Sequence, residues 1–335
     1  MLSRLVVQIQ STRCFSRTGK LWDRFTRDGL RQRMRKIQVK EAEPLFQHPV
    51  YPDSIPVRPH SHLWKAGIFS AVFTVGAFSV AALYDGYLAY DALRVPAGEL
   101  IRNFYKQTRR IAQDQEVELT PGMKCALSLI LANCVVTALW KVPQLQAFMW
   151  RYFSNSYASK SLCSPMLLSV FSHSSLIHLG LNMYVLWSFS GVAIDKFLGV
   201  PQFIAMYASA GVVASFTSLI HKSSIRSPIR AVGASGAILG LLAYTCSKIP
   251  EARLQIVFLP FFDFSAQSAI LGVILFDVIG LIAGFRLFDH AAHLGGALFG
   301  LAYAHLAEGY YRDMVDDNLK MFVESEKEEE RKKKK

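Results

Sequence analysis

The chain of 335 residues is poor in cysteine and in charge. Its five cysteines form no CxxC pair, so the sequence supports neither a disulfide framework nor a zinc ribbon. Short alternating strands separated by regular turn signals are also missing, which argues against the soluble α/β and all-β classes. Only 19% of the residues are charged and 52% are hydrophobic, and the charges avoid several long apolar runs.

These apolar runs predict an all-α polytopic membrane protein. A bilayer core is about 30 Å thick, so a helix needs about 20 mainly apolar residues to cross it. One run, 161–194, is longer than a single span needs, and we expect its first part to be a partly inserted loop. The segment 254–262 is too short to cross and is expected to be interfacial. The seven expected spans are 66–84, 125–140, the later part of 161–194, 197–220, 231–247, 264–285 and 290–307.

The N-terminal segment is strongly basic. The whole chain has a net charge of +12, and residues 1–40 contain eleven Lys or Arg against two Asp. A basic end on an apolar body indicates targeting or membrane topology rather than a surface for nucleic acid. Residues 1–22 combine basic side chains with frequent Ser and Thr and contain no acid, which predicts a mitochondrial transit peptide. A basic cytosolic tail is the alternative.

Polar segments divide the rest of the chain. Residues 41–63 contain five prolines and predict a linker, and residues 91–122 predict a polar spacer. An extra helix at 64–90 would then precede a core at 123–307, and the charged residues 308–335 are expected to be a solvated, frayed extension. Seven crossings place the termini on opposite sides of the membrane. The positive-inside rule then predicts the N-terminus in the matrix and the C-terminus in the intermembrane space.

Strongly polar residues interrupt the apolar runs in three places. The first is Ser235 in the stretch GASG. The second is a segment with His173, His178 and Asn182, and the third contains Asp289, His290 and His293. Polar side chains are costly in hydrocarbon and often functional there. These three places are therefore candidates for chemistry, and the alternative is that each group is simply hydrogen-bonded within the bundle.

Ser235 and His293 form a candidate dyad. A serine in an apolar helix often just bonds back to its own helix, but Gly233 and Gly236 bare the backbone around Ser235 and allow another helix to approach. In the last span, small residues recur every four positions at Ala292, Gly296, Gly300 and Ala304, one residue away from His293. Packing of these two smooth helices would place an imidazole across from the hydroxyl, as a general base requires.

His178 and Asn182 are candidate donors to an oxyanion. The two residues are four apart, so they share one face of a helix. A tetrahedral intermediate needs hydrogen-bond donors, and loss of one such donor typically costs about 3–4 kcal/mol in the barrier. The Ser235 backbone N–H is a further candidate. A nucleophile, a base and oxyanion donors on three helices together predict serine-hydrolase chemistry.

Other chemistries have weaker support in the sequence. Asp277 is the one acid deep in a span, and we expect it to bond neighbouring hydroxyls or backbone rather than to act in catalysis. An aspartyl intramembrane protease would need a GxGD motif, and a zinc metalloprotease an HExxH motif; the sequence contains neither. We expect no metal and no cofactor. A transporter or channel using intramembrane His and Asp, and a catalytically silent binder of transmembrane helices, remain open alternatives.

At these positions the sequence resembles the rhomboid intramembrane serine proteases. GASG around Ser235 is similar to the GxSG motif of that family, and AHLGG at 292–296 is similar to its AHxxG motif. HLGLN at 178–182 is similar to its HxxxN motif, and Trp150-Arg151 to its WR pair. The resemblance covers residues 120–307 and is strongest to a mitochondrial branch with one extra helix before the six-helix core.

This resemblance carries specific implications. It implies Ser235 as nucleophile, His293 as base, His178 and Asn182 in the oxyanion hole, and single-span membrane proteins as substrates in the inner mitochondrial membrane. Many bacterial members have an aromatic residue four positions after the nucleophile, stacked on the base, whereas this chain has Leu239. Another group must therefore hold the His293 ring.

Overall fold

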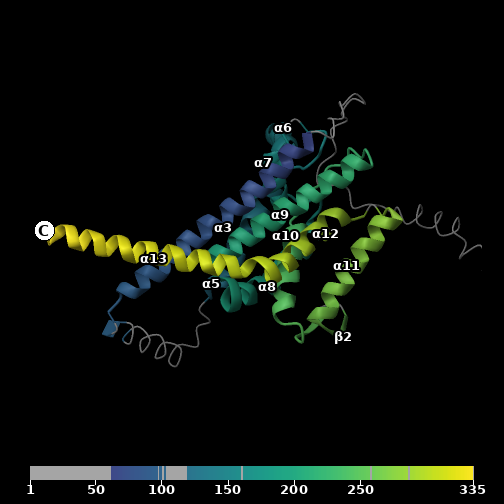
Figure 1. Ribbon diagram of the computed structural model, residues 1–335. Coiled ribbons are helices and arrows are strands. Elements are labelled where there is room, and N and C mark those ends of the chain that lie inside the picture. Colours follow the sequence, from purple (N-terminus) through teal and green to yellow (C-terminus); the bar gives the residue numbers. More distant parts are fainter. Residues whose placement is uncertain are drawn as a thin grey trace, which may run out of the picture. The chain divides into compact units, whose positions relative to one another are not determined.

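A computed structural model describes residues 62–96, 98–99, 102, 119–159, 161–256, 259–285 and 287–334. The expected transit peptide, most of the 41–63 linker and most of the 91–122 spacer lie outside these residues. The described part is predominantly helical (Figure 1). Its longer helices are α3 (Leu63–Arg94), α5 (Pro121–Leu139), α8 (Leu176–Ala193), α9 (Gly199–Ser224), α10 (Ser235–Lys248), α11 (Ala266–Ala283), α12 (His290–Ala302) and α13 (Glu308–Lys333).

Helices lie where the apolar runs predicted them. Four helical segments among the described residues are long and apolar enough to cross a membrane: Leu63–Arg94, Pro121–Leu139, Leu176–Ser224 and Ala266–Ala283. The third segment contains two helices, because a π-helical turn (Ile194–Leu198) and Gly199, with φ of 70°, separate α8 from α9. The helix α10 has 14 residues, fewer than a bilayer crossing needs, and α12 has 13 before the helical chain continues beyond it. The number of crossings therefore stays a prediction.

Polar side chains fix the starts of several of these helices. A helix leaves its first backbone N–H groups without a partner, and a Ser, Thr or Asp just before it can accept from one of them. Thr120, Ser175, Ser265 and Asp289 each accept a hydrogen bond from the N–H three residues later, at 3.1–3.2 Å. These caps set the beginnings of α5, α8, α11 and α12.

The helices α10 and α12 touch backbone to backbone, as the spacing of their small residues predicted. A Cβ atom added at Gly296 would collide with the carbonyl oxygen of Gly236. One added at Gly300 would collide with the carbonyl oxygen of Gly240 in the same way. Helices approach this closely only where side chains are absent. This contact holds the start of α10 beside the start of α12.

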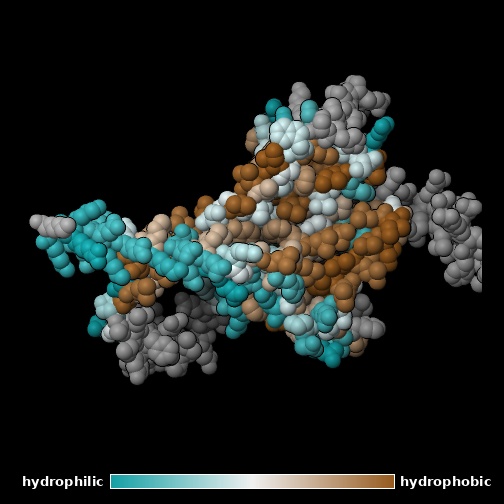
Figure 2. Space-filling model, viewed as in Figure 1, coloured by the Kyte–Doolittle hydropathy of each residue, from teal (hydrophilic) through white to brown (hydrophobic). Residues whose placement is uncertain are grey.

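The C-terminal segment differs from the frayed extension that its charge predicts. It continues from α12 through a π-helical turn (Tyr303–Ala307) into α13, which packs along the later half of α3 (Figure 1). Phe78 stacks on Tyr303 with ring centroids 4.6 Å apart, and the Tyr311 hydroxyl donates to Asp85. The opposite face of α13 is polar, whereas apolar side chains cover α11 (Figure 2).

Three shorter segments lie between the longer helices. The segment expected to be interfacial forms a β-hairpin of β1 (Arg253–Ile256) and β2 (Leu259–Ser265), a small departure from an all-α protein. The first part of the 161–194 run forms α7 (Cys163–Leu168) and a 3-10 turn (Ser169–Phe171), whose residues are buried or partly buried, and its depth in a membrane stays a prediction. A further 3-10 turn (Pro143–Leu145) and α6 (Gln146–Tyr152) precede them.

Candidate active site

Ser235 is the first residue of α10, so the apolar run 231–247 is helical only from its fifth residue onward. The preceding loop is tied down on two sides. Ala231 and Asn155 exchange two backbone hydrogen bonds of 2.8 Å, and the Gly233 N–H donates to the Ser169 carbonyl at 3.0 Å. Gly233 has φ of 135°, a backbone conformation that residues other than glycine rarely adopt. The loop thus presents Ser235 in one position at the helix start.

The His293 ring faces Ser235 across the contact of α10 and α12. Its Nε2 lies 2.8 Å from Ser235 Oγ, a normal hydrogen-bond distance. The glycine contacts between the two helices position both side chains, because they align the first turn of α12 with the first turn of α10. The structure therefore brings together the two residues of the candidate dyad.

Asp277 on α11 lies behind His293. Its Oδ1 is 3.2 Å from His293 Nδ1 and 2.7 Å from His290 Nδ1. The expectation that Asp277 bonds neighbouring hydroxyls or backbone is therefore wrong, because two imidazoles occupy it instead. An ionised carboxylate only accepts hydrogen bonds, so with Asp277 in that form each Nδ1 donates, and a neutral His293 ring then directs its lone-pair nitrogen Nε2 at Ser235. Asp277 and the Phe288 ring, 5.9 Å from that of His293, hold the base in place of an aromatic side chain at Leu239.

His178 and Asn182 have different surroundings. The His178 ring lies against the loop before Ser235, since a Cβ atom added at Gly233 would be 2.8 Å from its Cε1. Its Nδ1 is 3.1 Å from Ser174 Oγ. The Asn182 amide instead donates to the carbonyl of His178 in its own helix at 2.8 Å. The structure thus places His178 at the Ser235 loop and leaves Asn182 directed at its own backbone.

The remaining polar residue of this segment, His173, is fully buried and lies edge-on to His178, with ring centroids 5.0 Å apart. Of the WR pair, Trp150 packs edge-on against Trp140, and its carbonyl accepts from Arg230 at 2.8 Å. Arg151 lies over the Tyr152 ring. These contacts brace the segment that is paired with the Ser235 loop.

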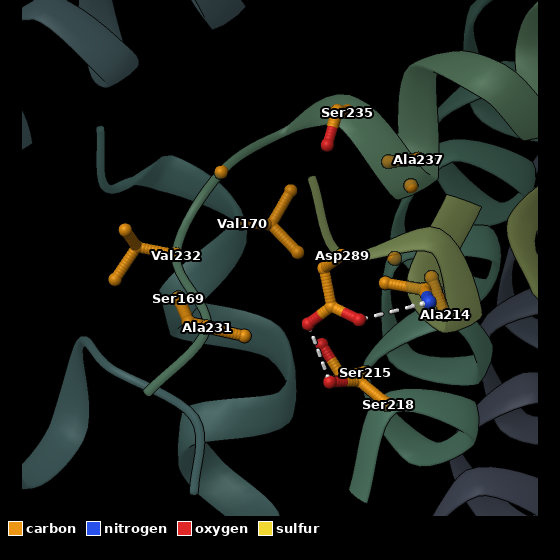
Figure 3. Close-up of a pocket in the computed structure, with 14 residues that line it drawn as sticks. Ser169, Val170, Ala214, Ser215, Ser218, Ala231, Val232, Ser235, Ala237 and Asp289 are labelled. Atoms are coloured by element: carbon orange, nitrogen blue, oxygen red, sulfur yellow. Dashed lines mark hydrogen bonds between the residues drawn. The ribbon is translucent and has the colours of Figure 1, made fainter. Parts of the chain in front are cut away.

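A small cavity of about 30 Å³ adjoins Ser235 on the side of α9 (Figure 3). Asp289 forms part of its wall, with its carboxylate directed toward Ser218 and away from Ser235 (Figure 3). The carboxylate accepts from Ser218 Oγ and Lys222 Nζ, both at 2.6 Å, and from the Ala292 N–H at 3.2 Å. Asp289 is therefore occupied by structural partners and is not aimed at the hydroxyl.

Sequence reasoning missed the assignment of Asp277 and His290 to this site. The signal in the sequence was a single acidic residue, Asp277, in an apolar run. The relative rotation of α11 and α12 decides which side chains this acid contacts, and the sequence does not give that rotation.

Within the described part of the chain, no group of three or more His, Cys, Asp or Glu side chains is arranged to hold a metal ion. The arrangement Ser235–His293–Asp277 is instead suited to nucleophilic catalysis by a hydroxyl.

Comparisons with known proteins identify relatives of this chain. The family model described as "Rhomboid domain" matches residues 160–308. The presenilin-associated rhomboid-like proteins, mitochondrial, of mouse and human are 41% and 40% identical over 302 residues, covering 82% of this chain and 78% of each relative. The yeast (Saccharomyces cerevisiae) protein "Rhomboid protein 1, mitochondrial" is 31% identical over 180 residues, covering 52% of this chain and 51% of its own length.

Proposed function

The chain belongs to the rhomboid family, and we propose that it is a serine endopeptidase that cuts single-span membrane proteins within or near the bilayer. The observation that supports this most strongly is the 2.8 Å distance between Ser235 Oγ and His293 Nε2. A transporter or a silent helix binder would not need a hydroxyl and an unprotonated imidazole nitrogen in this relation.

In the proposed reaction, Ser235 Oγ attacks the scissile carbonyl while its proton passes to His293 Nε2. The imidazolium that forms is paired with Asp277 at Nδ1, so Asp277 stabilises the positive charge that develops on His293. His293 then returns the proton to the leaving amine, and a water molecule hydrolyses the acyl-enzyme by the same steps. The cavity of about 30 Å³ beside Ser235 is large enough to hold such a water molecule.

Two kinds of donor are available for the oxyanion. The first intrahelical bond of α10 runs from the Ile238 N–H to the Ala234 carbonyl, so the Ser235 N–H precedes this ladder. His178 is the second donor. If the Ser174 hydroxyl donates to its Nδ1, the ring proton is on Nε2, which lies toward Gly233. Asn182 would have to release its helix carbonyl before it could join them.

We assign the protein to the inner mitochondrial membrane, on the basis of its basic N-terminal residues and of relatives whose names say "mitochondrial". The start of α3 packs with Tyr157 and Met166, in the half of the bundle that contains the Ser235 loop, while α13 leaves from the other half. With the N-terminus in the matrix, the site would open toward the matrix and the C-terminus would lie in the intermembrane space.

The test is cleavage of a panel of single-span proteins reconstituted in liposomes with wild type and with Ser235→Ala. We expect wild type to cleave at least one substrate and Ser235→Ala to lose cleavage by at least 10³-fold while keeping its melting temperature. A fluorophosphonate probe should label wild type and not Ser235→Ala. Ser188→Ala is a matched control, because among the described residues this exposed serine bonds back to its own helix, to the Tyr184 carbonyl.

The outcomes separate the alternatives. A folded wild type that neither cleaves nor reacts with the probe would reject the protease and favour a binder of transmembrane helices. Cleavage that survives in Ser235→Ala would reject Ser235 as the nucleophile.

A further inference from the structure

His290 is the first residue of α12 and lies one helical turn before His293 on the same face. Its side chain is 2% exposed and lies edge-on to the His293 ring, with centroids 6.4 Å apart, but no described hydrogen bond joins it to Ser235 or His293. Nδ1 is 2.7 Å from Asp277 Oδ1, closer than the 3.2 Å of His293 Nδ1 to the same oxygen. The shorter of the two bonds to this carboxylate thus comes from a histidine outside the proposed dyad.

The surroundings of His290 are otherwise apolar. Phe276 and Phe288 are edge-on to its ring, with centroids 5.3 and 6.0 Å away, and Phe285 is tilted toward it at 6.2 Å. Among the residues that the structure describes, no hydrogen-bond partner reaches its Nε2. The one described hydrogen bond of this ring is therefore the bond to Asp277. Burying a polar ring costs free energy, and here that single hydrogen bond is the described contact that offsets the cost.

The α11 backbone makes room for this contact. A Cβ atom added at Gly280 would collide with the His290 ring. Gly280 lies three residues after Asp277, on the same face of α11, so the missing side chain allows the imidazole to reach the carboxylate. The close approach of the His290 ring to Asp277 thus depends on His290 in α12 and on Gly280 in α11.

The chemistry of a shared carboxylate gives His290 a role. Asp277 has a side chain that is 1% exposed, and a buried carboxylate stays ionised only if donors satisfy it. The N–H of His290 supplies one donor that does not change during the reaction. It keeps the Asp277 carboxyl group oriented toward His293, whose Nδ1–H bond must strengthen when the proton arrives from Ser235.

We propose that His290 is a positioning residue of the proposed protease: by donating Nδ1–H to Asp277 it holds the carboxylate that orients and supports the base His293. The inference rests on the proposed function. It adds a fourth member, bonded in the order His290, Asp277, His293 and Ser235.

Three substitutions of His290 test this role, because they differ in whether and where the side chain carries a hydrogen-bond donor. Asn carries an amide N–H near the position of Nδ1, Gln carries it further out near Nε2, and Phe keeps a ring without any donor. We expect His290→Phe and His290→Gln to lower kcat by about 10- to 100-fold, or about 1.4 to 2.7 kcal/mol, with KM changed less than twofold. His290→Asn should restore kcat to within about threefold of wild type. The rate of Ser235 labelling by the fluorophosphonate probe should follow kcat.

A double-mutant cycle separates positioning from general stability. Because His290 acts only through Asp277, adding His290→Phe to Asp277→Asn should lower kcat by less than twofold further. Equal kcat in wild type and His290→Phe would overturn the proposal, as would a loss in His290→Asn as large as in His290→Phe. Independent effects in the cycle would also overturn it. If His290→Phe does not fold, His290→Gln, which also lacks a donor at the position of Nδ1, takes its place in the cycle. An inactive wild type would instead reject the protease function itself.

Discussion

At the scale of single residues, the site depends on a backbone conformation as much as on its reacting groups. Gly233 has φ of 135°, and its missing side chain leaves room for the His178 ring. Sequence alone indicated that Gly233 bares the backbone near Ser235. The need for a positive φ and the contact with His178 follow only from how the loop is tied to Ser169 and Asn155.

Replacing Gly233 with Ala tests this dependence. The strained φ would cost about 1–3 kcal/mol, and the added Cβ would displace the His178 ring. Since a misplacement of about 1 Å can lower rates by about 10²-fold, we expect cleavage to fall at least tenfold. Gly272→Ala on α11 is the control, because a Cβ atom there meets no described atom within 4 Å. Equal rates of cleavage in Gly233→Ala and wild type would show that the loop tolerates other conformations.

At the scale of helices, the contact between α10 and α12 could be predicted from the four-residue spacing of small side chains. The position of His293 beside Ser235 follows from that spacing. Asp277 and His290 could not be placed in the same way, because a uniformly apolar helix such as α11 has no polar face that fixes its rotation about its axis. Only the three-dimensional structure therefore identifies Asp277 as the residue that contacts the base His293.

A side chain at the contact should separate these two helices. Gly296→Val would force the Gly236 carbonyl away, and overpacking of this kind costs about 1–3 kcal/mol. We expect a lower melting temperature in detergent and a loss of cleavage larger than the loss of folded protein, because His293 moves with α12. Gly191→Val on α8, where a Cβ atom meets no described atom within 4 Å, should keep its cleavage rate. Cleavage at the wild-type rate in Gly296→Val would contradict the tight contact.

The helix α13 was missed because its high charge conceals a narrow apolar stripe. Tyr311, Val315 and Phe322 lie on the side that faces α3, and charged residues fill most of the other positions. Composition averages over both sides, so it predicted a solvated tail. The partner surface on α3 lies more than 200 residues earlier in the chain, beyond the reach of local pattern analysis.

Adjacent tyrosines offer a matched test of this packing. Tyr311 is 3% exposed and Tyr310 is 73% exposed. Truncation of a large buried aromatic side chain costs about 3–5 kcal/mol, whereas surface changes usually stay within about 0.5 kcal/mol. We therefore expect Tyr311→Ala to lower the melting temperature in detergent clearly and Tyr310→Ala to leave it almost unchanged. Equal melting temperatures for the two variants would show that α13 does not pack on α3.

At the scale of the whole molecule, location and orientation rest on charge. The basic residues of the first 22 positions, Arg4, Arg13, Arg17 and Lys20, are the basis for the predicted import into mitochondria. Their replacement by Glu should leave the protein outside mitochondria. Replacement of Ser3, Ser11 and Thr12 by Ala should not, and fluorescence microscopy distinguishes the two results.

A tag after Lys335 gives the orientation. It should resist protease in intact mitochondria and become sensitive once the outer membrane is opened. A tag that stays protected in these mitoplasts would place the C-terminus in the matrix and reverse the proposed orientation.

The packing of α3 against α13 also has a consequence for synthesis. A ribosome makes the first of these helices long before the second, so part of the α3 surface stays uncovered until α13 has been made. Its Asp85, which accepts a hydrogen bond from Tyr311, has no such donor until translation has nearly ended. Docking of α3 on α13 is therefore among the last events of folding, and a chain that stops short of α13 would be left with an acidic side chain that lacks this donor.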